Sequence, residues 1–248
     1  MVLEGKVALI TGGGQGIGRA LSLGLAEAGA EVALAQRTVS RVEAVAAEIE
    51  ALGRRALPLH VDVTHKASVE AMIDAVVSEL GRLDILVNNS GIFPITQITR
   101  ISEEEWDQVI ATNLKGVFLC SQAALTPLRH AGAGRIINMA SVSGRVGAVG
   151  FAHYAASKGG VIAFTKALAR EAAALNVTVN AISPGIVEGE TTRRTFPEVA
   201  IKGYIAQTPL RRLANPEDIA GLAVFLASPA SAYITGQVFA VDGGYTMV

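Results

Sequence analysis

The sequence is poor in the residues that build disulfide bridges and metal centres. It contains one cysteine and four histidines among 248 residues. A lone cysteine cannot close an intramolecular disulfide, and the histidines are scattered without the spacing of metal ligands. We therefore expect no metal site, and a cytoplasmic protein whose hydrophobic core is large enough to fold without crosslinks.

The chain also lacks an excess of either charge. Its 21 basic and 22 acidic side chains leave a net charge of −1, which provides no basic field for binding a nucleic acid. Glu4 and Lys6 interrupt the apolar start, so we expect no signal peptide. The uncharged stretch 219–241 is broken in its middle by Ser228 and Pro229. It predicts a helix, a turn and a buried strand rather than a membrane span.

Prolines are few, eight against 26 glycines, which favours tight turns between regular elements over disorder. Short apolar runs alternate with longer stretches of helical period, and runs such as 85–87 are apolar enough to be buried on both faces of a sheet. This alternation predicts an α/β protein with a Rossmann-like, doubly wound fold, in which helices cover both faces of a seven-stranded, mostly parallel sheet. The predicted strands are 7–11, 31–36, 56–61, 83–89, 135–141, 177–183 and 237–241. The predicted helices are 16–28, 40–52, 66–80, 102–125, 154–175 and 216–227.

No linker or low-complexity tract divides the chain, so we interpret 1–248 as a single dinucleotide-binding and catalytic domain. Its least regular stretch, 184–209, follows the sixth strand on the side of the sheet where ligands bind. Loops of this length are usually functional or disordered. The stretch predicts a mobile substrate lid, with a plain surface loop as the alternative.

The first predicted strand runs directly into a glycine-rich turn, TGGGQGIG at 11–18, that opens a helix. Gly12 permits the tight turn, Gly16 lets the backbone approach a pyrophosphate, and Gly18 lets the helix pack closely on the sheet. The helix N-terminus adds N–H donors for phosphate oxygens. A glycine-rich turn without a ligand is the alternative. The candidate cofactor-binding residues here are Gly12, Gln15, Gly16, Ile17 and Gly18.

Polar residues follow the next three predicted strands. Dinucleotide folds place an acidic residue after the second strand when it binds the ribose 2′-OH of NAD. Here a neutral residue precedes Arg37, which can pair with the 2′-phosphate of NADP; a solvated surface arginine is the alternative. Asp62 can accept a hydrogen bond from the adenine amino group while Val63 offers its backbone, although a helix cap explains Asp62 equally well. The segment NNSG either places Asn89 and Gly91 at the same edge or simply marks a turn.

Reactive side chains gather later in the sequence. Tyr154 and Lys158 stand four residues apart in a helical stretch and so share one helix face. A phenol with a pKa of about 10 is a poor acid–base catalyst at neutral pH, and a neighbouring ammonium favours the phenolate. Ser141, at the end of the fifth strand, can donate to a carbonyl or alkoxide oxygen. Asn113, in the preceding helix, can hold a water that passes protons to Lys158.

In these motifs and their order the sequence resembles the short-chain dehydrogenase/reductase family, and the resemblance covers the whole chain. It implies that Tyr154 is the acid/base and that Ser141 orients the carbonyl. It implies that Lys158 lowers the pKa of the tyrosine and holds the nicotinamide ribose, and that Asn113 supports the relay water. The matching motifs are TGGGQGIG, Asp62 with Val63, NNSG, Asn113, Ser141, YAASK, SPG at 183–185 and the ending ITGQVFAVDGG.

The resemblance also implies cofactor contacts after the sixth strand, at Pro184, Gly185 and the backbone of Val187. Two positions depart from the family pattern. Ser90 stands where alanine is usual, a small change. Gly189 stands where many members have a threonine that contacts the nicotinamide carboxamide. The anchoring of the nicotinamide in this chain is therefore an open question.

We expect an NADP(H)-dependent oxidoreductase, with NAD(H) as the alternative cofactor, that acts on a ketone or secondary alcohol as a carbonyl reductase or dehydrogenase. The alternative is reduction of 3-oxoacyl thioesters such as 3-oxoacyl-(acyl-carrier-protein), because similar family members have this activity. Those members carry basic residues near the site mouth, where this chain has Gly132 and Leu175; Arg129, His130 and Arg135 lie close to the first. A non-catalytic dinucleotide-binding sensor is a third reading, which the complete tetrad disfavours. The resemblance further implies a homotetramer, arranged as a dimer of dimers.

Overall fold

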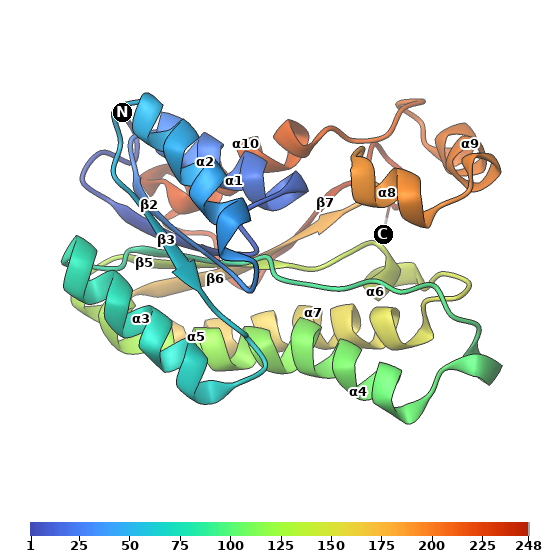
Figure 1. Ribbon diagram of the computed structural model, residues 1–248, viewed down its shortest axis with the longest axis horizontal. Coiled ribbons are helices and arrows are strands. Elements are labelled where there is room, and N and C mark those ends of the chain that lie inside the picture. Colours follow the sequence, from blue (N-terminus) through green and yellow to red (C-terminus); the bar gives the residue numbers. More distant parts are fainter. Residues whose placement is uncertain (248) are drawn as a thin grey trace.

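The computed structural model describes residues 1–247, and at their centre lies a sheet of seven strands in the order β3-β2-β1-β4-β5-β6-β7 (Figure 1). Every neighbouring pair is parallel. The predicted fold class is confirmed, and each predicted strand lies within two residues of its observed limits. The strands are β1 Val7–Thr11, β2 Glu31–Gln36, β3 Ala56–His60, β4 Ile85–Asn88, β5 Gly134–Met139, β6 Val177–Pro184 and β7 Val238–Val241.

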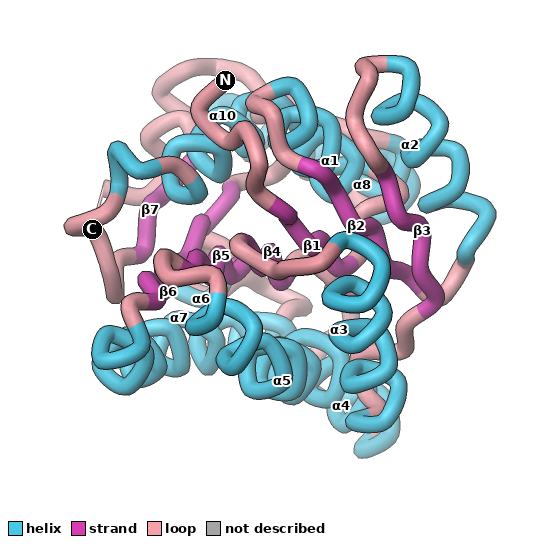
Figure 2. Tube along the Cα trace, turned by 90° about the vertical axis from the view of Figure 1, so that its left-hand side faces the viewer, coloured by secondary structure: helices cyan, strands magenta, loops and turns pink. Residues whose placement is uncertain are grey.

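Helices cover both faces of this sheet, which explains why its central strands are apolar throughout. Figure 2 shows the strands between two helical layers, with α1, α2 and α10 on one side and α3, α5 and α7 on the other. Within β1, Ile10 packs into the first layer and Leu9 into the second. The helices are α1 Gly16–Glu27, α2 Val39–Ala51, α3 Lys66–Leu80, α4 Glu103–Ile110, α5 Gly116–His130, α6 Ser143–Val146, α7 Ala152–Ala172, α8 Glu190–Thr195, α9 Glu198–Gln207 and α10 Pro216–Ala227. Short 3-10 turns occupy Ile98–Arg100, Ala173–Leu175 and Pro229–Ser231.

The helix predicted over 102–125 is present, but it extends to His130 and is not a regular α-helix throughout. The segment begins with α4, which Ser102 caps by accepting a hydrogen bond from the N–H of Glu105 at 3.2 Å. It then widens into a π-helical turn, Ala111–Lys115, before continuing as α5. A π turn inserts one extra residue into the helical ladder and commonly occurs at functional sites. The periodicity of apolar residues could not reveal it.

The stretch 184–209 is more regular than the sequence indicated, because it contains α8 and α9. The two helices are separated at Pro197, which cannot continue α8 and restricts the residue before it to an extended conformation. The prediction for 219–241 is half right. The helix ends at Ala227, but β7 is the edge strand of the sheet and is only partly buried.

Within residues 1–247, no helix has both the length and the apolar character needed to cross a membrane.

Candidate active site

A cleft of about 620 Å³ opens at the carboxyl ends of the strands, beside β1 and β4. The strand order reverses between these two strands, and ligands of doubly wound sheets bind outside such a switch point. Every cofactor-binding residue predicted from the sequence lines the cleft. They are Gly12, Gln15, Gly16, Ile17, Gly18, Arg37, Asp62, Val63, Asn89, Gly91, Tyr154, Lys158, Pro184, Gly185 and Val187.

The glycine turn after β1 has the geometry of a phosphate cradle. Gly12 adopts a positive φ of 70°, and a Cβ on Gly18 would lie 1.9 Å from the carbonyl oxygen of Gly12. Only glycine therefore allows α1 to begin so close to the end of β1. The N-cap residue of α1, Gln15, makes no side-chain hydrogen bond to the helix start. A pyrophosphate fits here, because the first N–H groups of α1 need acceptors.

Two arginines line the far end of the cleft, beyond this turn. Arg37 follows β2, and Arg41 lies one helical turn later on α2. The guanidinium of Arg41 donates a hydrogen bond to Oε1 of Gln15, while Oε1 of Gln36 accepts from the N–H of Gly14 at 3.2 Å. Sequence reasoning missed Arg41, although its spacing of four residues from Arg37 was a usable signal. Guanidinium groups at this end would suit a phosphate group of a bound nucleotide.

Asp62 is not the cap of α3, whose N-cap residue is His65. Instead, Oδ1 of Asp62 accepts hydrogen bonds from Thr64, from the backbone N–H at 3.0 Å and the hydroxyl at 2.7 Å. Burial by itself raises the pKa of Asp62, but the hydrogen bonds from Thr64 outweigh it and hold the pKa below its usual value. The side chain is therefore a carboxylate that lines the cleft.

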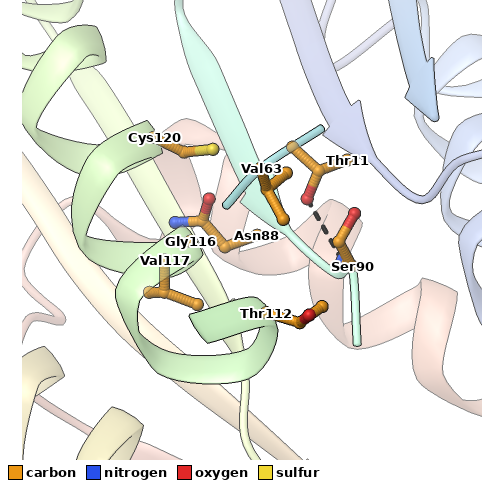
Figure 3. A pocket seen from close by; sticks show the side chains of 8 residues that line it. All are labelled: Thr11, Val63, Asn88, Ser90, Thr112, Gly116, Val117 and Cys120. Carbon is orange, nitrogen blue, oxygen red and sulfur yellow. Dashed lines mark hydrogen bonds between the residues drawn. The ribbon is translucent and has the colours of Figure 1, made fainter. Parts of the chain in front are cut away.

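The hydroxyl of Thr11 helps to hold the floor of the cleft between β1 and β4. Oγ1 of Thr11 accepts hydrogen bonds from the N–H groups of Asn89 and Ser90, both at 3.1 Å. Figure 3 shows the contact between Thr11 and Ser90, with Asn88 and Cys120 deeper between the sheet and α5. The side chain of Ser90 takes no part in this contact, which uses only its backbone.

Cys120 is fully buried in this region, and burial raises the pKa of its thiol to about 12. It packs as a small apolar side chain.

Tyr154, Lys158 and Ser141 meet in the middle of the cleft. Ser141 follows β5 and forms a hydrogen bond with the Tyr154 hydroxyl. Nζ of Lys158 lies 5.8 Å from the centroid of the Tyr154 ring and donates to the carbonyl oxygen of Met139 at 2.6 Å. Asn113 is buried close to Lys158, and Gly91 lies beside both. A Cβ built on Gly91 would be 3.3 Å from Oδ1 of Asn113 and 3.7 Å from Nζ of Lys158.

The side-chain amide of Asn113 is already engaged by its surroundings. Its Oδ1 accepts from the N–H of Ile92 at 2.9 Å, and its Nδ2 donates to the carbonyl oxygen of Ile92 at 2.8 Å and to Oγ of Ser157 at 3.2 Å. Both N–H groups of the amide are thereby used. The side chain of Asn113 fixes the segment after β4 against α7, a positioning contact that the sequence did not indicate.

Burial controls the charges of the reactive pair. It raises the pKa of the Tyr154 phenol, against a smaller lowering by the hydrogen bond with Ser141. Burial also lowers the pKa of Lys158 to about 8. These directions differ from the lowering of the tyrosine pKa that the family resemblance implied. The reason is that both groups lie in a region of low dielectric, where each charged form is disfavoured.

The residues around Gly189 show how this part of the cleft is held. Oγ1 of Thr192 donates to the carbonyl oxygen of Val187 at 2.6 Å, and Arg193 pairs with Glu188 at 2.7 Å. The N–H of Gly189 donates to Oε1 of Glu188 at 3.2 Å. Thr192 is therefore tied to the backbone of the residue expected to meet the carboxamide.

Gly132 and Leu175, where other family members carry basic residues, lie at the amino-terminal ends of the strands, away from the cleft. Gly132 precedes β5 and Leu175 precedes β6, whereas the cleft lies at the carboxyl ends of these strands. Arg135, within β5, is buried and donates to the carbonyl oxygens of Ala133 and Gly134. The closeness of Arg135 to Gly132 along the chain therefore does not bring it to the cleft. Gly132 and Leu175 do not line this cleft, so the absence of basic side chains there does not change the charge of its lining.

Comparisons with known proteins agree with this architecture. Residues 12–246 match the family described as Enoyl-(Acyl carrier protein) reductase. The chain is 44% identical over 248 residues to the 3-oxoacyl-(acyl-carrier-protein) reductase FabG of Vibrio cholerae, with all of both chains covered. It is 41% identical over 244 residues to the enzyme of the same name from Thermotoga maritima, covering 98% of this chain and 99% of that one. A crystal structure of a short-chain type dehydrogenase/reductase from Mycobacterium marinum superimposes with a TM-score of 0.93 at 40% identity, covering 99% and 97% of the two chains.

The chain belongs to the short-chain dehydrogenase/reductase family. The predicted resemblance is thereby confirmed over the full length. As a member of this family the protein is an oxidoreductase that acts on C=O and CH–OH groups with a nicotinamide cofactor. Of the substrates considered from the sequence, the relatives favour the 3-oxoacyl thioester, which was the alternative, over a free ketone or alcohol.

Proposed function

We propose that this protein reduces 3-oxoacyl thioesters to 3-hydroxyacyl thioesters with NADPH. Two relatives that are more than 40% identical over almost the whole chain are named for this substrate bound to acyl carrier protein. The position of Gly132 and Leu175, at the edge of the sheet away from the cleft, removes the main reason from the sequence to prefer a free ketone. A free ketone or secondary alcohol is the second candidate, since the cleft would accept either carbonyl.

The observation that carries this proposal is the meeting of Ser141, Tyr154 and Lys158 beside a phosphate cradle in one cleft. The nicotinamide, when bound, supplies a hydride to the carbonyl carbon at C3 of the substrate. Ser141 donates a hydrogen bond to the carbonyl oxygen and orients it. Tyr154 transfers its phenolic proton to that oxygen, so that C=O becomes CH–OH and the tyrosine is left as phenolate.

Lys158 and Asn113 have supporting roles in this scheme. With a pKa of about 8, Lys158 carries its positive charge at neutral pH, where it stabilises the phenolate that Tyr154 becomes. It also holds the nicotinamide ribose. Asn113 positions the chain segment after β4 beside Lys158, where a relay water can return a proton to the tyrosine.

NADPH is the proposed cofactor because of the charge at the far end of the cleft. Arg37 and Arg41 lie there beyond the glycine turn, at the place where an NAD-binding chain has a carboxylate. Asp62 accepts from the adenine amino group in this proposal, and Val187 meets the carboxamide through its backbone.

We propose in addition that 184–209 closes over the substrate as a lid within one domain, 1–248. The homotetramer and the cytoplasmic location stay predictions from the sequence.

The test follows the absorbance of NADPH while the enzyme is offered 3-oxobutanoyl-N-acetylcysteamine beside simple ketones and diketones. A higher kcat/KM for the thioester is expected. A clear preference for free carbonyls contradicts the proposed substrate and favours the second candidate. Binding of the nucleotide without turnover of any carbonyl contradicts the enzymatic proposal and favours the dinucleotide-binding sensor.

A further inference from the structure

The ring of Tyr154 lies in a group of phenylalanines contributed by three separate segments. Phe93, from the loop after β4, packs edge-on against it with ring centroids 6.2 Å apart. Phe151, just before α7, does the same at 5.6 Å. Phe196, between α8 and α9, stacks on Phe151 at 5.9 Å with an interplanar angle of 27°. We call Phe93, Phe151 and Phe196 the aromatic wall; all three line the cleft.

The wall occupies the opposite end of the cleft from the arginines. Arg37 and Arg41 line the cleft beyond the phosphate cradle, whereas the wall borders Tyr154, which gives its proton to the substrate carbonyl. The two ends thus suit different chemistry, one a phosphate and the other an apolar group.

The local sequence dictates where Phe196 lies. Pro197 confines the preceding residue to extended backbone, and Phe196 has φ −103° and ψ 131°. On its far side, α9 is anchored by the buried side chains of Ile201 and Tyr204 packed with Leu213. Phe196 itself packs against this cluster, so its ring is held between the cluster and Phe151.

We infer that the aromatic wall binds the acyl tail of the substrate, so that the enzyme selects 3-oxoacyl thioesters with an extended apolar tail over the 3-oxobutanoyl group. This inference rests on the proposed function. The carbonyl at C3 must reach Ser141 and Tyr154, and two chain segments extend from C3. The segment with the thioester leads to a polar carrier that stays in solvent. The acyl tail is therefore the segment that can be buried against the rings.

The size of the expected selection follows from the burial of apolar surface. Each methylene removed from water strengthens binding by about fourfold. The 3-oxooctanoyl group has four more methylenes than the 3-oxobutanoyl group, and burial of about half of their surface gives a preference of about fifteenfold.

The stacking of Phe151 on Phe196 also suggests a second role for Phe196, that of a plug in the tail site. The experiment below distinguishes this role from tail binding. If the ring of Phe196 fills the space that the tail needs, it acts as a plug and must withdraw before a long tail binds. Removal of a plug speeds the reduction of long substrates, whereas removal of part of a wall slows it. The two roles therefore predict opposite signs.

The experiment compares kcat/KM for 3-oxobutanoyl- and 3-oxooctanoyl-N-acetylcysteamine with NADPH, in the wild type and in Phe196→Ala, Phe196→Leu and Val199→Ala. We expect a wild-type preference of about fifteenfold for the longer substrate, expressed mainly in KM. Phe196→Ala should reduce this preference to about twofold, and Phe196→Leu should retain most of it because leucine replaces much of the apolar surface. Val199, on α9 and 77% exposed, is the matched control on the same segment.

Each outcome bears on the inference. Equal efficiency with both substrates in the wild type overturns the aromatic wall as a tail-binding site but leaves the proposed function standing. Faster reduction of 3-oxooctanoyl by Phe196→Ala overturns it in favour of the plug. Failure of the wild type to reduce either thioester overturns the proposed function and this inference together. The wild-type comparison needs no variant, so a misfolded substitution does not prevent the test.

Discussion

Lys158 lies beneath the ring of Tyr154, with its Nζ 5.8 Å from the ring centroid, and its ammonium donates a hydrogen bond to the carbonyl oxygen of Met139 at the end of β5. This bond joins α7 to the sheet at the point where the reactive side chains meet. Lys158 is buried and Tyr154 is half-buried, and loss of solvent shifts both pKa values toward the neutral forms. The pair is therefore held in place by the strand, and its charge state is set by its burial.

Replacement of Tyr154 by phenylalanine should remove the proton transfer while leaving the fold intact. The phenylalanine ring keeps the edge-on contacts with Phe93 and Phe151. We expect Tyr154→Phe to lower kcat by about a thousandfold or more, with the dissociation constant of NADPH nearly unchanged. Steady-state kinetics and calorimetric titration of NADPH measure the two effects. Substantial residual turnover would show that another group donates the proton.

Lys158 should make stability depend on pH in a defined window. In the folded protein its pKa is lowered to about 8, against 10.5 as the ordinary value. Between these two pH values the unfolded chain binds more protons, so the free energy of unfolding rises with pH. Below the lower value the full cost of burying the ammonium remains.

The measurement for Lys158 is urea denaturation of the wild type and of Lys158→Met between pH 7 and pH 10. The wild type should gain about 2 kcal/mol relative to the variant as the pH rises through this range. The raised pKa of Tyr154 acts in the opposite direction at still higher pH, which is why the range ends there. A difference between the two proteins that does not change with pH contradicts the lowered pKa of Lys158.

Arg37 should determine the choice between the two nicotinamide cofactors. We expect Arg37→Asp to shift the ratio of kcat/KM for NADPH over NADH by about a hundredfold toward NADH, because a charge-assisted bond is replaced by repulsion of the 2′-phosphate. Binding of 2′,5′-ADP, measured by calorimetry, should be lost in parallel. Arg129→Asp makes the same charge change at the exposed end of α5 and is the matched control. An unchanged cofactor ratio would mean that the 2′-phosphate binds elsewhere.

Gly18 should tolerate no side chain. A Cβ there would lie 1.9 Å from the carbonyl oxygen of Gly12, so the turn would have to open. We expect Gly18→Ala to destabilise the protein by about 2–3 kcal/mol and to weaken binding of both cofactors. Gly221→Ala is the control, because a Cβ at this exposed position of α10 meets no atom within 4 Å. It should raise stability by up to about 1 kcal/mol. Equal thermal denaturation curves for the two variants would contradict the close packing of the turn.

The elements that local pattern specifies were predicted well. The limits of β1, β2, α3 and α10 agree with the sequence end to end, because apolar runs bounded by glycine or by polar turns fix them. The π turn at Asn113 was missed, since an inserted residue leaves the apolar periodicity almost intact. The helices α8 and α9 were missed because each is too short to give a clear period.

The site residues also divide into those that the sequence indicated and those that it did not. Those that lie in local motifs, such as Gly12 with Gly18 and Tyr154 with Lys158, were found from their spacing in the sequence. They line one cleft because the carboxyl ends of the parallel strands meet on the same side of the sheet. Phe151 and Phe196 carry no motif, and their contact joins positions far apart in the sequence. The position of Arg135 was likewise beyond the sequence, because its closeness to Gly132 along the chain does not say at which ends of the strands it lies.

The sequence by itself determined the fold class, the family and the residue types that carry the chemistry, because these depend on periodicity and on short motifs that the backbone must satisfy locally. The tertiary structure decided which side chains surround the reacting tyrosine, which edge of the sheet each basic residue occupies, and in which direction the pKa values of Tyr154 and Lys158 move. These properties depend on distance and burial, and both arise only when segments distant in the chain pack together.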